Sequence, residues 1–209
     1  MRHERKYRIE SIAYEEVLRH VMTLPRAFSE SYPDRWVNSI YLDDILFNAL
    51  NQNLDGNSNR SKFRLRWYGV DIHSIHNPVL EEKVKRNKLG YKNNKQLSSI
   101  VLEAEALKSV LNESEILDKN LFPKVLVRYQ RTYLESFDHR VRITIDRNLN
   151  YFGFNGYHLN PFATLDDAVI VEVKYSQDMD EEMTEIFQAL RFRLSKNSKY
   201  VSAVESFWA

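Results

Sequence analysis

The feature that most constrains the fold is a period-two alternation of apolar and polar residues, which returns in seven segments of the chain. Such alternation predicts β-strands with one buried face. The segments are residues 4–12, 35–42, 62–68, 80–85, 124–136, 140–146 and 168–175. Helical spacing of apolar residues predicts four helices, at residues 14–24, 44–54, 95–111 and 181–194. Strands therefore dominate, and the order of the elements predicts an α+β fold.

The polar face of these strands is unusually ionic. In residues 62–68, Arg64 and Arg66 alternate with Phe63 and Leu65, and comparable ionic faces return in most other segments. A solvated charged face would explain any single strand, but it explains the recurrence less well, because helices must cover the apolar face. We therefore expect a closed antiparallel β-barrel, which removes sheet edges, with helices packed outside. The cations expected on its inner face are Lys6, Arg64, Arg66, Lys83, Lys85, Arg131, Arg142 and Lys174.

Cations gathered in an interior require an anionic partner or water, because burying them unpaired is costly. The planar fork of arginine matches phosphate oxygens, and a row of Arg and Lys fits a linear polyphosphate better than a flat nucleic-acid surface. The carboxylates among these cations have two interpretations, ion pairing or binding of Mg²⁺ or Mn²⁺. Metal binding is favoured for Glu172 and ion pairing for Glu81. For Glu4, neither interpretation is favoured over the other.

Composition excludes several classes of protein. The 209 residues suit one domain, 1–209, and the 43% apolar content is that of a globular chain. The absence of cysteine excludes disulfides, zinc–thiolate sites and cysteine nucleophiles, and it fits a reducing compartment. A net charge of +1 argues against a nucleic-acid binder. No apolar segment has the ~18 residues of a membrane span or forms a signal peptide, so we expect a cytoplasmic protein.

Short motifs in chain order resemble the triphosphate tunnel metalloenzyme (CYTH-like) superfamily, and within it the VTC domain, a polyphosphate polymerase module. The similar elements are Glu4-Arg5-Lys6, Tyr41-Leu42-Asp43, Arg64-Leu65-Arg66-Trp67-Tyr68-Gly69, Glu81-Glu82-Lys83, Tyr129-Gln130-Arg131, Val141-Arg142-Ile143-Thr144-Ile145-Asp146, Glu172-Val173-Lys174 and Ser198-Lys199-Tyr200. The order of these elements covers nearly the whole chain. The resemblance therefore implies the triphosphate tunnel fold.

The resemblance also implies roles for individual residues. The cations that would grip phosphates during catalysis are Lys6, Arg64, Arg66, Lys83, Arg131, Arg142 and Lys199. Tyr129 and Ser198 would add hydrogen bonds to phosphate, and Glu172, with Glu4, would hold Mn²⁺ or Mg²⁺. Lys85 and Lys174 are also expected to bind phosphate, because the alternation along their strands places them on the same face as the other cations. His3 is expected to be exposed or in the core.

Three functions remain open for such a site. The first is a polymerase that transfers the γ-phosphoryl group of ATP to a polyphosphate chain. The second is a hydrolase of triphosphate or nucleoside triphosphate, and the third is a protein that binds polyphosphate without turnover. Eukaryotic members of the family carry an inositol-phosphate-sensing domain and a membrane anchor, which we do not expect here. A separate membrane partner and the oligomeric state are left open.

Overall fold

The computed structural model describes residues 2–87 and 89–208, without the side chains of Arg2, Leu89, Leu117 and Asp118. The chain forms two compact units. Unit 1 comprises Met1–Arg35, Tyr129–Leu149 and Asp166–Asn197, and unit 2 comprises Trp36–Arg128, Asn150–Leu165 and Ser198–Ala209. One domain over residues 1–209 stays a prediction, and its residues 1, 88 and 209 lie outside the described residues.

Nine strands of the described residues form one antiparallel sheet with the hydrogen-bonding order β1-β11-β9-β8-β2-β3-β5-β6, and β10 pairs with β9. Their bounds are β1 Arg2–Ile9, β2 Ser29–Asp43, β3 Asn59–Tyr68, β5 Val79–Arg86, β6 Leu89–Gln96, β8 Phe122–Glu135, β9 Val141–Asn155, β10 His158–Asp166 and β11 Val169–Ser176. The short strands β4 (Ser74–Ile75) and β7 (Ile100–Val101) form a second sheet. The predicted sheet-dominated α+β architecture is confirmed.

The predicted closed β-barrel is wrong. The strand order begins at β1 and ends at β6, and no pairing joins these two strands in the described part of the chain. The outer edge of β1 instead hydrogen-bonds to Ser195, whose backbone N–H donates to the Lys6 carbonyl at 2.8 Å. The Arg8 N–H donates to the Ser195 hydroxyl at 2.9 Å. At the other end, β6 exposes Lys92 and Lys95, and charged side chains of this kind discourage further pairing of an edge strand.

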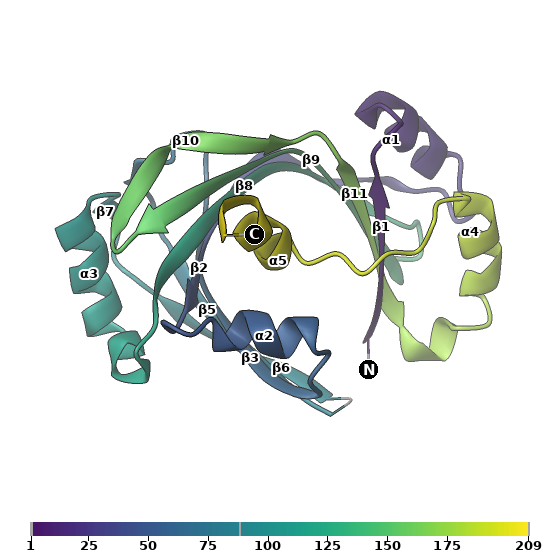
Figure 1. The fold of residues 1–209 in the computed structure, drawn as a ribbon. Coiled ribbons are helices and arrows are strands. Elements are labelled where there is room, and N and C mark those ends of the chain that lie inside the picture. The colour runs from purple at the N-terminus through teal and green to yellow at the C-terminus, as the bar shows by residue number, and fades with distance from the viewer. Residues whose placement is uncertain (1, 88, 209) are drawn as a thin grey trace. The chain divides into compact units, whose positions relative to one another are not determined.

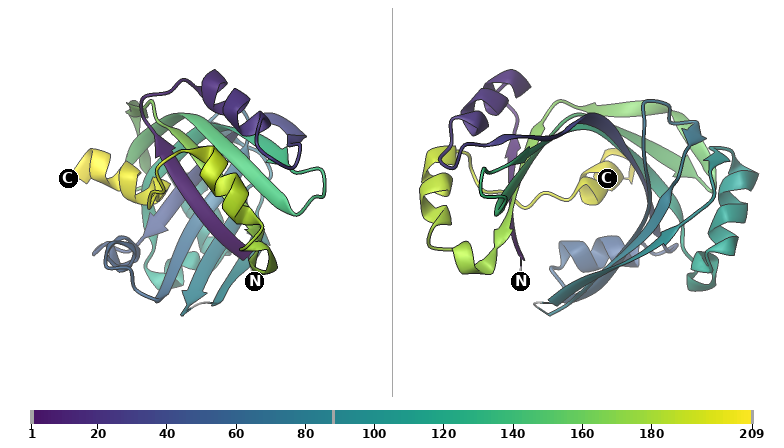
Figure 2. Two further views of the ribbon diagram at one scale, coloured as in Figure 1. Left: turned by 90° about the vertical axis from the view of Figure 1, so that its right-hand side faces the viewer. Right: turned by 180° about the vertical axis from the view of Figure 1, so that it is seen from behind.

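In unit 1, two helices cover the apolar face of the strands. Helix α1 (Tyr14–Met22) buries Val17 and Val21, and α4 (Met183–Leu190) buries Ile186. These side chains pack with alternate residues of the strands, such as Ile143 and Val171. Each aliphatic side chain buried this way contributes ~1.5–3 kcal/mol. Figure 1 shows both helices beside β1 and β11, and the left view of Figure 2 shows α4 in front of β1. The opposite, polar face of these strands therefore remains for other contacts.

In unit 2, helix α3 (Ala104–Glu113) lies beside the sheet and buries Leu107 and Leu111. These residues pack with Leu65 of β3 and Leu80 of β5. Two further helices of this unit are α2 (Asn48–Leu54) and α5 (Lys199–Trp208), and the short 3-10 helices of the chain are η1 (Ile116–Lys119) and η2 (Gln177–Met179). No described helix is both long and apolar enough to cross a membrane.

The helix predictions hold with one exception. Three of the four predicted helices are present with shorter bounds, as α1, α2 and α4. The prediction at residues 95–111 is wrong in its first half, because residues 95–96 end β6 and residues 100–101 form β7. Strands β6 and β10 and helix α5 were not predicted. The sequence of β6 is almost uniformly polar, so it lacks the alternation that marks a half-buried strand.

Candidate functional site

Strands β3, β5 and β6 of unit 2 present a strongly basic face. Cross-strand neighbours lie on the same side of a sheet and side chains alternate along each strand, so the register assigns this face directly. Its cations are Arg60, Lys62, Arg64, Arg66, Lys83, Lys85 and Lys92. Glu81 is the one carboxylate that the same strands place there among the described residues. We call this set the basic face.

Three lysines form a row straight across the basic face. Lys62 of β3 is directly opposite Lys83 of β5, which is directly opposite Lys92 of β6. Side chains in such positions have Cβ atoms ~4.5–5.5 Å apart, and like charges there destabilise the sheet. The row therefore favours an anion bound over it. Lys62 also donates a hydrogen bond from Nζ to the Ser198 hydroxyl at 3.1 Å.

Glu81 holds the arginines of the basic face in place. Its carboxylate accepts from Arg64 Nε at 2.5 Å and pairs with Arg66 Nη2 at 2.9 Å, and it also pairs with Lys92. The side chain of Glu81 is only 5% exposed. The predicted pairing role of Glu81 is therefore confirmed. One carboxylate neutralises one of the three cations that it contacts, so the face keeps a surplus of positive charge.

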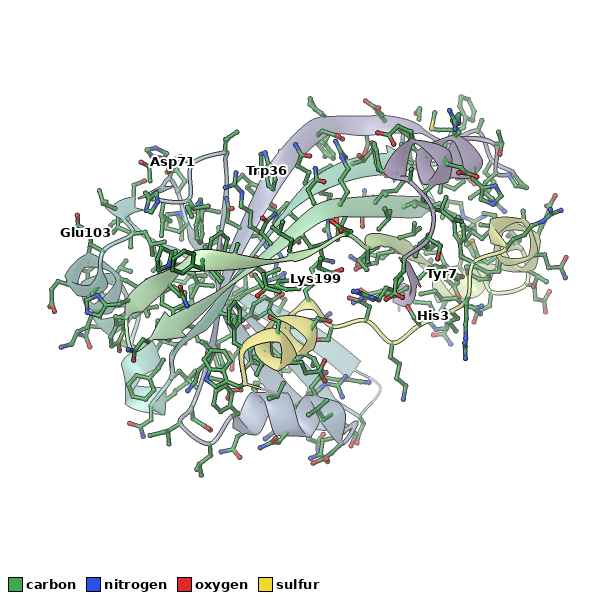
Figure 3. The ribbon with its side chains drawn as sticks, turned by 45° about the horizontal axis from the view of Figure 1, so that its top comes forward. His3, Tyr7, Trp36, Asp71, Glu103 and Lys199 are labelled. Atoms are coloured by element: carbon green, nitrogen blue, oxygen red, sulfur yellow. The ribbon has the colours of Figure 1, made fainter. Side chains whose placement is uncertain are left out.

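The start of helix α5 is held against this face by an aromatic contact. Tyr200 stacks on Tyr41 of β2 with ring centroids 5.2 Å apart, and its hydroxyl donates to Asp43 at 2.6 Å. Burial, together with the Asp43 carboxylate, raises the pKa of Tyr200 well above its ordinary value, so its hydroxyl keeps the proton that it donates. Lys199 is the first residue of α5 (Figure 3), directly after Ser198. The predicted residues Ser198 and Lys199 thus belong to the same unit as the basic face.

Unit 1 holds a different cluster, in which carboxylates and lysines balance. On the polar face of β1 and β11, Glu4 is opposite Lys174 and Lys6 is opposite Glu172. Lys6 Nζ lies 2.8 Å from Glu4 and 3.7 Å from Glu172. Lys174 also pairs with both carboxylates, with Glu4 at 3.8 Å. We call these four residues the carboxylate–lysine cluster.

The remaining predicted residues of unit 1 are engaged by acidic partners or buried. Arg131 donates two hydrogen bonds to the buried carboxylate of Asp146, at 2.5 and 2.7 Å. Burial acts to lower the pKa of Arg131, but the Asp146 carboxylate outweighs it, and the pKa lies well above its ordinary value. Arg142 is exposed and donates to Glu135 at 2.8 Å. Tyr129 is buried, with the Arg131 guanidinium 5.1 Å from its ring centroid.

The carboxylate–lysine cluster fits a divalent metal by its donor chemistry. Magnesium is usually held by one or two carboxylates together with substrate phosphates and water. Oxygens of Glu4 and Glu172 approach the same Lys6 nitrogen, so the two carboxylates lie near each other. No group of three or more acidic or histidine side chains suited to a metal occurs in the described part of the chain. Substrate oxygens would therefore have to complete the coordination.

The structure thus sorts the predicted site residues into two sets. The basic-face set comprises Arg64, Arg66, Lys83, Lys85, Ser198 and Lys199 in unit 2. The unit 1 set comprises Glu4, Lys6, Glu172, Lys174, Arg131, Arg142 and Tyr129. His3, labelled in Figure 3, lies outside both sets. Its Nδ1 is 3.0 Å from Asp180, and its ring meets the Tyr175 ring edge-on.

Three cations of the basic face, Arg60, Lys62 and Lys92, were not predicted as site residues. Lys62 shares a strand face with Arg64 and Arg66 in the sequence pattern, but it was given no role. Lys92 was missed because β6 was not recognised as a strand, and Arg60 was missed because β3 begins three residues earlier than predicted, at Asn59. The sequence does show several lysines after residue 80, Lys92 among them. Their spacing alone does not say which of them share a face of the sheet, because that depends on the register of Lys92 with Lys83.

The fold and the basic face together define an antiparallel α+β protein equipped to hold a polyanion. Solved structures of similar fold include candidate adenylate cyclases from Vibrio parahaemolyticus (12% identity, TM-score 0.56, covering 97% of both chains) and Bacillus halodurans (12%, 0.53, covering 99% of this chain and 96% of that one). A candidate adenylyl cyclase from Hippeastrum, described as having a dominant triphosphatase activity, is similar at 14% identity and a TM-score of 0.54, covering 99% of this chain and 96% of that one. No curated protein is significantly similar to the sequence.

A family model then identifies the chain more closely. The model of the VTC domain matches residues 1–208, so this chain belongs to the VTC domain family. The family resemblance inferred from the motifs is therefore confirmed.

Proposed function

We propose that this protein is a divalent-metal-dependent polyphosphate polymerase that uses ATP as the phosphoryl donor. The observation that carries the proposal is the row of Lys62, Lys83 and Lys92 on the basic face, because three cations in register suit a ligand with evenly repeated negative charge. Membership of the VTC domain family supports the same ligand. The partners in this proposal are ATP and inorganic polyphosphate, and the compartment is the cytoplasm, where ATP is available.

The proposed reaction needs no nucleophilic side chain. A terminal oxygen of the polyphosphate chain attacks the γ-phosphorus of ATP, the bond from that phosphorus to the β–γ bridging oxygen breaks, and ADP leaves. The chain grows by one phosphate and no water is consumed. Phosphoryl transfer of this kind depends on in-line positioning and on neutralisation of charge. Arg64 and Arg66, oriented by Glu81, would position phosphate oxygens, and Lys83 would add charge.

Glu4 and Glu172 would hold the Mn²⁺ or Mg²⁺ ion. A bound divalent ion supplies charge neutralisation on the transferring phosphates. In the carboxylate–lysine cluster, Lys6 and Lys174 occupy these carboxylates as ion-pair partners. An incoming polyanion attracts both ammonium groups and leaves the carboxylates available, so phosphate and metal would bind together more tightly than separately.

Hydrolysis of triphosphate is a second candidate. It is favoured by the triphosphatase activity described for the structural neighbour from Hippeastrum. The same cations would hold the substrate, and water would take the place of the phosphate chain as the attacking group. The two reactions differ in their products, since hydrolysis releases free phosphate and polymerisation does not.

Product analysis separates these functions. The protein is incubated with ATP and Mn²⁺, and the products are resolved by gel electrophoresis and by a phosphate assay. Polymerisation yields ADP and a ladder of long phosphate polymers. Release of free phosphate without polymer would reject the polymerase in favour of the hydrolase, and tight tripolyphosphate binding without turnover would support a binding protein.

Substitution of Lys83 tests whether the basic face holds the ligand. Lys83 is exposed, so Lys83→Ala leaves the fold intact, and loss of a charge-assisted contact of ~1.5–3 kcal/mol lowers polyphosphate affinity about 10- to 100-fold. Lys108→Ala is the matched control, because Lys108 is an exposed lysine on α3. Equal effects of the two substitutions would show that only net charge matters and would reject the assignment of the basic face. Arg64→Ala should abolish binding.

A further inference from the structure

Unit 1 carries an aromatic and cationic cluster that the proposed chemistry does not use. Tyr32 of β2 and Tyr133 of β8 meet edge to face, with ring centroids 5.8 Å apart. The guanidinium carbon of Arg35 lies 5.4 Å from the Tyr32 centroid and 4.8 Å from the Tyr133 centroid. We call these three residues the tyrosine–arginine cluster. Tyr32 is 59% exposed, so a large part of its ring is available to a ligand.

We propose that the tyrosine–arginine cluster binds the base of the nucleoside triphosphate donor, an inference that rests on the proposed function. Aromatic rings and arginine planes are the surfaces on which proteins stack nucleobases. A tyrosine ring offers a wide contact area at a low cost in side-chain entropy. An exposed ring already bordered by a guanidinium therefore presents both surfaces to one planar ligand.

The position of the cluster relative to the proposed metal ligand supports this assignment. The guanidinium carbon of Arg131 lies 5.9 Å from the Tyr133 centroid. Arg131 in turn interacts electrostatically with Glu172, the proposed metal ligand. The path from Tyr133 to Glu172 crosses from β8 through β9 to β11, two strand spacings of ~4.8 Å each. A nucleoside triphosphate lying in this direction would place its base on the tyrosine–arginine cluster and direct its phosphates toward the proposed metal ligand Glu172.

The chemistry of the cluster also predicts its selectivity. Stacking acts on the face of a base and tolerates changes at its edges. We therefore expect purine triphosphates to bind more tightly than pyrimidine triphosphates, because their rings are larger, with little discrimination between ATP and GTP. Inorganic tripolyphosphate has no base, so its binding should not depend on the tyrosine–arginine cluster.

The test compares the affinities of ATP and tripolyphosphate, each with Mg²⁺, by titration calorimetry. Tyr32→Ala should weaken ATP binding about tenfold and leave tripolyphosphate binding unchanged. Tyr32→Phe keeps the ring and should retain most of the ATP affinity. Tyr91→Ala is the matched control, because Tyr91 is a similarly exposed tyrosine in unit 2. In the wild type, the adenine H2 and H8 proton resonances of ATP should move upfield on binding, and this shift should be lost in Tyr32→Ala.

The outcomes separate this inference from the proposed function. An unchanged ATP affinity in Tyr32→Ala, or equal losses for ATP and tripolyphosphate, would overturn the base-binding site, even if the wild type makes polymer. A selective loss for ATP in a protein that hydrolyses ATP without making polymer would support the base-binding site and reject the polymerase.

Discussion

Replacing Glu81 by glutamine removes the one carboxylate that β3, β5 and β6 place on the basic face, with almost no change in side-chain volume. Arg64, Arg66 and Lys92 then lose the negative charge that all three contact. The glutamine can still accept one hydrogen bond, so the main change is electrostatic. We expect Glu81→Gln to lower the free energy of unfolding of the ligand-free protein and to increase its response to phosphate ligands.

The magnitude follows from the burial of the four side chains. Breaking a buried ion pair by removing one partner costs ~3–5 kcal/mol. Glu81 is 5% exposed, but Arg64 and Lys92 are 24% and 41% exposed, so water screens the cations that remain. We therefore expect a loss of ~2 kcal/mol at low salt. For a chain of 209 residues, each kcal/mol lowers the melting temperature by ~2–4 °C.

Urea denaturation with and without tripolyphosphate is the assay. A ligand that binds only the folded state at 100 times its Kd stabilises it by ~2.7 kcal/mol, and the gain should be larger in Glu81→Gln because the ligand no longer competes with Glu81 for the cations. Glu82→Gln is the control, because Glu82 points to the opposite side of β5 and contacts Lys119 at 3.7 Å. Equal destabilisation by the two substitutions, or no extra stabilisation of Glu81→Gln by tripolyphosphate, would refute the reasoning.

Three further predictions concern other parts of the chain. Glu172→Gln should preserve metal-free tripolyphosphate binding but reduce metal-dependent turnover at least 100-fold, and unchanged turnover would contradict the proposed metal role. Tyr200→Phe removes the 2.6 Å hydrogen bond to Asp43 and should cost ~1.5–3 kcal/mol in urea denaturation. The Ser136 hydroxyl and Arg26 hold the pKa of Asp138 below its ordinary value, so the stability from this group is present above pH ~3.9 and is lost as the pH falls through the lowered pKa. Acid titration of unfolding should show a smaller loss in Asp138→Asn than in the wild type.

Much of the architecture could be predicted from local pattern, because the strands that cover a hydrophobic core alternate clearly. Residues 62–68 lie within β3, and residues 168–175 match β11 (Val169–Ser176) to within one residue at each end. Closure into a barrel could not be predicted from local pattern, because it depends on which groups hydrogen-bond to the free backbone edge of β1. That edge is occupied by Ser195, a residue with no distinguishing sequence pattern.

Strand parity also predicted which side chains share a face, but it could not predict their partners. Arg131 was expected to face phosphate, and parity alone did not reveal its bidentate bond to Asp146 of the neighbouring strand. For the same reason, strand parity could not predict the net charge of the basic face or of the carboxylate–lysine cluster. The basic face keeps a surplus of cations, while Lys6 and Lys174 pair with two carboxylates, and only the register distinguishes these cases.

The pairing of β1 with β11 has a consequence for synthesis of the chain on the ribosome. Arg2 is registered with Ser176, so β1 has no neighbour in the sheet until synthesis has reached β11. At ~5–20 residues per second, this delay is roughly 10–35 s. During that time the apolar residues of β1, including Tyr7 and Ile9, have no folded surface of their own sheet to cover them. We therefore expect β1 to depend on chaperone binding while the residues up to β11 are made, and unit 1 to complete its folding late.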